Sequence, residues 1–80
     1  MECFLGQIQL FALGFVPHGW RLCDGANLPI ANYPALYSLL GATYGGDGST
    51  TFALPNLKGK EPIPGLIYCI CVEGIYPLRD

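Results

Sequence analysis

Residues near the start of the chain alternate between two kinds of position. One set consists of Ile8, Leu10 and Ala12, and the other consists of Gln7, Gln9 and Phe11. Successive side chains of a strand point to opposite faces, so a period of two predicts a strand over residues 6–12. We expect the face with Ile8 and Leu10 to be the buried one.

The end of the chain carries a different pattern. Residues 66–72 read Leu-Ile-Tyr-Cys-Ile-Cys-Val, with no polar alternation, and Pro62, Pro64 and Gly65 interrupt regular structure just before them. A continuous apolar run of this length is typical of a strand buried on both faces. The second face is covered either inside the subunit or by another subunit.

One short helix is predicted, over residues 33–40. Asn32 is a plausible N-cap, Pro34 is tolerated in the first turn, and Gly41 can adopt a positive φ after the last turn. Its apolar face consists of Leu36, Leu39 and Leu40. Two turns of helix are unstable alone, so this segment must pack against the rest of the domain.

Turns and short extended pieces fill the middle of the chain. Pro17 and Gly19 predict a turn, residues 20–23 a short strand, and Asp24-Gly25 a second turn. Residues 44–51 are rich in glycine and lack periodicity, so we expect either an ordered loop or a disordered segment there. Residues 52–57 read as an extended stretch outside any ladder, because Pro55 cannot donate a hydrogen bond. We therefore predict a single α+β domain over residues 1–80, with short strands, one helix and much loop.

The composition bears on how this domain meets its surroundings. Of the 80 residues, 51% are hydrophobic and only 12% are charged. A chain this short has too little interior for so many apolar side chains, which favours burial against other copies. No apolar run reaches the ~18 residues of a membrane-spanning helix. The net charge of −2 and the lack of a basic cluster argue against a nucleic-acid partner.

Candidate chemistry is sparse. Asp47, among Ser and Thr hydroxyls, could contact a metal or a sugar, but a calcium loop needs several carboxylates, so a structural turn is favoured. His18 lies in a turn without a second ligand at zinc spacing. No Ser, Thr or Cys is paired with a base in sequence. We expect no enzyme activity and no catalytic, cofactor-binding or metal-binding residue.

Several motifs together resemble the phage tail collar family, whose members include short tail fibres and the bacterial proteins called microcystin-dependent. The resemblance begins with Gly6-Gln7-Ile8-Gln9-Leu10-Phe11 and continues through residues 17–25, 36–48 and 50–60. The closing residues 74–79, Gly-Ile-Tyr-Pro-Leu-Arg, are similar to the C-terminus of the microcystin-dependent type. The resemblance therefore extends over nearly the whole chain.

The resemblance implies a structural protein that assembles as a trimer, located in a virion or an extracellular appendage. Family members usually carry a long variable segment, often rich in histidine, before the terminal strand. Here only Glu61-Pro62-Ile63-Pro64-Gly65 stands in its place, so the receptor-binding and metal-binding parts are missing. No signal peptide is seen, and release by lysis or a non-classical route is expected. Other tail or appendage proteins are further expected partners.

Four cysteines fall into two pairs. Cys23 and Cys69 stand where the family also carries Cys or a small apolar residue, and we expect buried thiols there. Cys3 and Cys71 depart from the family pattern, one near each end. They suggest a disulfide between subunits, with two reduced, buried thiols as the alternative. The residues expected at subunit contacts are Cys3, Phe4, Ile67, Cys69, Ile70 and Cys71.

Two functions from different classes remain open at this point. The first is a self-assembling structural subunit, as a trimer or as a head-to-tail filament. The second is a module that binds surface carbohydrate through exposed aromatic side chains. The aromatic residues considered for that surface are Trp20, Tyr33, Tyr37, Tyr44, Phe52, Tyr68 and Tyr76.

Overall fold

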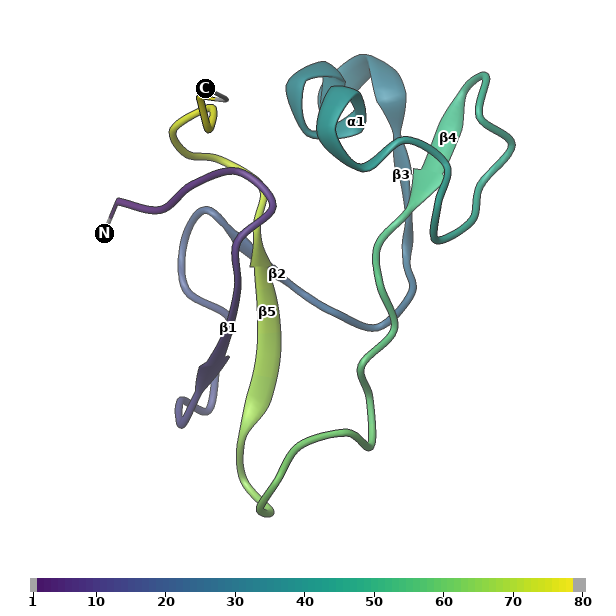
Figure 1. Cartoon of the computed structure of the whole chain (residues 1–80). Coiled ribbons are helices and arrows are strands. Elements are labelled where there is room, and N and C mark those ends of the chain that lie inside the picture. The colour runs from purple at the N-terminus through teal and green to yellow at the C-terminus, as the bar shows by residue number, and fades with distance from the viewer. Residues whose placement is uncertain (1, 79–80) are drawn as a thin grey trace.

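The computed structural model describes residues 2–78 and confirms the α+β class. Five short strands accompany one α-helix and one 3-10 helix (Figure 1). In chain order these are β1 (Ile8–Phe11), β2 (Trp20–Leu22), β3 (Asn27–Pro29), the 3-10 helix Ile30–Asn32, α1 (Pro34–Leu40), β4 (Thr51–Ala53) and β5 (Ile67–Cys71).

Strand β5 is the centre of a three-stranded sheet with the order β1-β5-β2. Both neighbours are antiparallel to β5, with Ile8 opposite Ile70 and Trp20 opposite Cys71. Strands β1 and β2 are consequently parallel to each other, although they follow one another in sequence. The connection between them, residues 12–19, therefore runs back along the sheet from the end of β1 to the start of β2 (Figure 1).

Both faces of β5 are buried within one chain. Of the two alternatives for the apolar run, burial inside the subunit is therefore the correct one. Ile70 belongs to a cluster with Leu28, Leu36 and Phe52, whereas Cys69 and Cys71 belong to a second cluster with Phe11 and Trp20. The side chains of Cys69, Ile70 and Cys71 are 0% exposed. This strand therefore holds two small cores together.

The buried face of β1 is the opposite of the predicted one. Phe11 is buried and contacts Trp20 edge-on, with ring centroids 4.9 Å apart, while Ile8 is 40% exposed. Both faces of this strand carry apolar residues, and the larger aromatic side chain takes the interior because Trp20 lies on the same side of the sheet. The expectation that Ile8 and Leu10 face the core was wrong.

A second sheet of two strands lies beside α1. Phe52 on β4 stands opposite Leu28 on β3, and its ring lies 5.4 Å from that of Tyr37 on the helix. The sequence pattern does not predict β3, and the expectation that Phe52 and Ala53 lie outside a ladder was wrong. Pro55 follows the paired residues, so its missing N–H does not disturb them.

Helix α1 forms almost where the sequence predicts it. It begins at Pro34, and the residue before it is Tyr33 rather than Asn32, which lies in the preceding 3-10 helix; no side chain caps the N-terminus. At the other end Gly41 has φ 59°, and its N–H donates to the carbonyl of Tyr37. Leu36 is the helical residue that enters the core.

Candidate interaction surface

The glycine-rich loop is organised by the carboxylate of Asp47. Its Oδ1 accepts hydrogen bonds from the backbone N–H groups of Ser49, Thr50 and Thr51 at 2.7–2.9 Å, and Oδ2 accepts one from the Thr50 hydroxyl at 2.7 Å. The Thr50 hydroxyl and these backbone N–H groups hold the pKa of Asp47 well below its usual range. Asp47 therefore serves as a structural anchor of the loop.

Gly46 allows the same loop to lie directly against β4. It has φ 88°, and a Cβ placed there would collide with Cα of Phe52 and lie 2.6 Å from the carbonyl oxygen of Thr51.

Within residues 2–78, no three His, Cys, Asp or Glu side chains gather as a metal site would require. Asp47 is the single carboxylate of this loop, and its bonds go to the loop itself.

Cys3 and Cys71 form a disulfide, and they do so within one chain. The sequence suggests a disulfide between Cys3 of one subunit and Cys71 of another; in the structure the same two cysteines are joined within one chain. The physical reason is that residues 3–6 are not a free arm: Cys3 and Leu5 exchange backbone hydrogen bonds with Ile75 at 2.8 and 2.9 Å. Cys3 is consequently buried, with 5% of its surface exposed.

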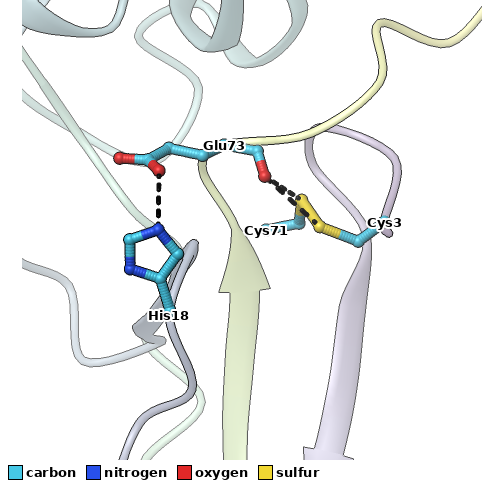
Figure 2. A network of polar contacts seen from close by, with 4 residues as sticks. All are labelled: Cys3, His18, Cys71 and Glu73. Atoms are coloured by element: carbon cyan, nitrogen blue, oxygen red, sulfur yellow. Dashed lines mark hydrogen bonds and ion pairs between the residues drawn. A yellow bond between two sulfur atoms is a disulfide. The ribbon is translucent and has the colours of Figure 1, made fainter. Parts of the chain in front are cut away.

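The carbonyl oxygen of Glu73 lies beside this disulfide (Figure 2). It is 3.6 Å from the sulfur of Cys3 and 3.5 Å from that of Cys71. Because a disulfide sulfur carries no hydrogen, these are close contacts and become hydrogen bonds only for reduced thiols. The side chain of Glu73 points the other way, toward His18, and its Oε2 lies 3.6 Å from Nε2 of the imidazole. Both side chains of that pair are well exposed, so it adds little to stability.

Cys23 and Cys69 are free thiols, buried as predicted. Burial, with the neighbouring Cys69 and Asp24, raises the pKa of Cys23 to about 11. Burial also raises the pKa of Cys69. Neither thiol is activated as a nucleophile, because the reactive form is the thiolate.

The six residues expected at subunit contacts do not lie on one surface. Cys3, Cys69, Ile70 and Cys71 belong to the interior of the single chain. Phe4 is 54% exposed and Ile67 is partly exposed. A role in assembly stays a prediction for these last two residues.

Exposed apolar side chains instead gather at two places that sequence analysis did not identify. We call the first the terminal patch; its members line one hollow and are Phe4, Ile75, Tyr76, Pro77 and Leu78. Leu78 is 95% exposed. Tyr76 is held by a 2.8 Å hydrogen bond between its hydroxyl and that of Ser38 on α1, which fixes this segment against the domain.

We call the second the crossover patch, because it includes the connection between β1 and β2. Its members line a hollow of about 400 Å³ and are Leu13, Phe15, Val16, Leu66 and Ile67. Phe15 is 65% exposed. No pattern in the sequence distinguishes these side chains from core residues, since exposure depends on how residues 12–19 cross the sheet.

The aromatic side chains considered for a carbohydrate surface are dispersed. Trp20 and Phe52 are buried, and Trp20 has a buried indole N–H without a partner among the described residues. Tyr44 and Tyr76 are exposed. Tyr33, Tyr37 and Tyr68 pack against the core. The structure does not bring the seven together on one face.

The structure contains only short helices in the part of the chain that it describes, residues 2–78. None has the length and apolar character that crossing a membrane requires.

Comparison with known proteins assigns this fold to a family. Residues 6–62 match the phage tail collar domain. Protein RhiB of Rhizobium leguminosarum bv. viciae is 48% identical over 44 residues, which are 51% of this chain and 20% of RhiB. The chain thus spans about a fifth of that relative. Of the closing residues 74–79, which resemble the C-terminus of the microcystin-dependent type, Arg79 lies outside the described residues. Since the match extends over well more than half of the chain, the protein belongs to the phage tail collar domain family, a family of structural proteins.

Proposed function

We propose that this protein is a structural subunit of a phage tail or of a phage-derived appendage, and that it associates with copies of itself. Membership of the collar family supports the tail-type structural role. The observation that carries self-association is the presence of two exposed apolar patches on one small domain. Exposed apolar side chains that gather at one place mark a candidate interaction surface.

The most exposed members of the patches contribute most of the free energy that a contact between copies can gain. Phe4, Phe15 and Leu78 are each more than half exposed, and burying an apolar side chain of this size contributes about 1.5–3 kcal/mol. Association itself costs on the order of 4–15 kcal/mol. Several such side chains must therefore be buried together, which a contact between whole patches provides.

The proposed location and partners follow from the same family membership. A tail or appendage subunit acts in a virion or outside a cell, beside other tail or appendage proteins. A closed trimer and an open filament both satisfy the proposed role, since both repeat one contact between copies.

Electron microscopy of the purified protein tests this proposal. We expect fibres or small closed particles for the wild type. We expect an empty field for a variant with Phe4, Leu13, Phe15 and Leu78 all changed to Ser, provided that circular dichroism shows it folded. An empty field for the wild type, together with a mass near 8.6 kDa by light scattering of the same sample, contradicts the proposal.

A further inference from the structure

We infer that the Cys3–Cys71 disulfide is a redox latch that closes on a domain already folded. The reduced protein has the same fold, with two thiols in place of the bond. Oxidation then fixes residues 3–6 against the end of β5 without rearranging either segment. This latch operates in a single chain as well as in an assembly, so it goes beyond the proposed self-association.

A hydrogen-bond acceptor for the reduced thiols is already in place. The carbonyl oxygen of Glu73 lies 3.6 Å from the sulfur of Cys3 and 3.5 Å from that of Cys71 (Figure 2). A carbonyl oxygen has two lone pairs and a thiol is a weak donor, so this one oxygen can accept from both thiols. Reduction therefore leaves neither buried S–H without a partner, which removes a cost that would otherwise oppose the reduced fold.

Backbone hydrogen bonds hold the two cysteines together independently of the disulfide. The N–H of Ile75 donates to the carbonyl of Cys3 at 2.8 Å, and its carbonyl accepts from the N–H of Leu5 at 2.9 Å. The N–H of Gly6 donates to the carbonyl of Cys71 at 3.0 Å. The side chain of Leu5 is buried in the core. Because none of these contacts needs the sulfur–sulfur bond, they bring the two thiols together before it forms.

Gly74 makes this close approach possible. A Cβ at this position would collide with the carbonyl oxygen of Cys3 and lie 2.6 Å from the sulfur of Cys71. Any side chain here would therefore push the two segments apart. The latch thus depends on a residue that carries no sulfur, and a substitution there leaves all four cysteines in place.

The fold also selects this pair among the four cysteines. Cys69 belongs to the same buried cluster as Cys3 and Cys71, yet it is a free thiol. It lies two residues before Cys71 on one strand, so the two side chains project in parallel and are poorly placed to bond each other. The hydrogen bonds of residues 3–6 lead to Cys71 and Ile75 and not to Cys69.

Burial determines the order of the chemical steps. Cys71 lies on the central strand and is 0% exposed, whereas Cys3 lies outside the sheet and is 5% exposed. When residues 3–6 open, the thiolate of Cys3 attacks a small disulfide such as oxidised glutathione, forms a mixed disulfide and releases one thiolate. After the segment returns, the sulfur of Cys71 attacks that of Cys3 and its proton passes to the second thiolate released. Two protein thiols are oxidised, and the small disulfide is reduced to two thiols.

Oxidation of the reduced protein tests the latch. Reduced wild type is first titrated with urea, and we expect a cooperative transition that begins from the same far-ultraviolet circular dichroism as the oxidised protein has. It is then treated with oxidised glutathione without denaturant, and its thiols are counted after unfolding. We expect the count to fall from four to two, with the new bond between Cys3 and Cys71 and no multimers on a non-reducing gel.

Variants separate the steps. We expect Cys71→Ser to stop at a mixed disulfide on Cys3. We expect Cys3→Ser to react with glutathione much more slowly, because its three remaining thiols are all buried. Gly74→Ala should form the internal bond several-fold more slowly than the wild type. Gly14→Ala is the matched control and should behave as the wild type, since nothing lies within 4 Å of a Cβ placed there.

The contrary results are equally specific. A reduced wild type that is unfolded without urea overturns the inference, and so does Gly74→Ala that closes at the wild-type rate. If Gly74→Ala does not fold, the two serine variants decide, because equal rates of reaction with glutathione contradict the proposed order of steps. A wild type that remains a single chain contradicts the proposed self-association and leaves the latch intact.

Discussion

Cys3 and Cys71 are separated by 68 positions in the sequence, and a disulfide joins them with their Cα atoms 6.3 Å apart. The bond ties the segment before β1 to the end of the central strand. Backbone hydrogen bonds of Leu5 and Gly6 to Ile75 and Cys71 run beside it. One side of the terminal patch, at Phe4, is therefore fixed to the other side, at Ile75.

We expect removal of this bond to destabilise the domain. Closing a loop of this length stabilises a fold by about 4 kcal/mol in the chain-entropy description, so Cys3→Ser should lower the free energy of unfolding by roughly that amount. Urea unfolding measures it. The matched control is Cys69→Ser in the oxidised protein, which leaves the bond intact.

The same variant separates a bond within one chain from a bond between chains. Oxidised wild type in a denaturing gel should run as one monomer band that shifts in mobility when thiol is added. A ladder of multimers that collapses with reductant, and vanishes in Cys3→Ser, would instead place the bond between subunits.

Ile70 gives the sharpest test of the core. Its side chain is 0% exposed, so Ile70→Asp removes apolar contacts and buries a carboxylate, at a combined cost of at least about 4 kcal/mol. Domains of this kind are stable by about 5–15 kcal/mol in total, so we expect Ile70→Asp to lose a large part of its free energy of unfolding. Ile8, directly opposite on β1, is 40% exposed, and Ile8→Asp should leave the fold intact. Equal effects in both variants would contradict the arrangement of the sheet.

Gly46 and Gly48 form a matched pair in the loop after α1. Both have positive φ, 88° and 72°, so alanine costs about 1–2 kcal/mol at either position through the backbone. Only at Gly46 would the Cβ collide with β4; at Gly48 the nearest atom is Cβ of Ala42, at 3.6 Å. We expect Gly46→Ala to lower Tm clearly more than Gly48→Ala. Equal shifts in thermal unfolding would show that the loop does not lie against Phe52.

The carboxylate of Asp47 predicts a dependence on pH. Its pKa in the folded protein lies below its ordinary 3.8, so the ionised carboxylate stabilises the fold above about pH 4. That stability is lost as pH falls toward the folded pKa. Asp47→Asn keeps an oxygen acceptor but not the charge, and it should be less stable than the wild type at neutral pH. The difference between the two proteins, followed by urea unfolding, should shrink as the pH falls; a constant difference would contradict this role.

Much of the fold could be predicted from local pattern. The expected helix 33–40 and terminal strand 66–72 differ by one or two residues from α1 and β5, because a helical period and a long apolar run are local signals. Strand β3 was missed because its three residues carry no periodicity and exist only through pairing with β4. The prediction of which face of β1 is buried was wrong, because apolar residues occupy both faces. The position of Trp20 determines which face is buried.

Less of the candidate surface could be predicted. The sequence pointed to Cys3 and Cys71 as a pair, but the path of residues 3–6 beside Ile75 determines that the bond closes within one chain. Phe15 and Leu78 read as ordinary apolar residues, and their exposure follows from loops that cover no core. Phe4 and Ile67 remain predicted contact residues, since each lies in one of the two patches.

The central claim is that this collar domain exists as an assembly of identical copies. The most direct test is the absolute mass of the purified wild type by light scattering at micromolar concentration, with the protein eluting from a sizing column. We predict that most of the protein has a mass several times 8.6 kDa. A single species near 8.6 kDa, with no larger species at any concentration tested, would contradict the account.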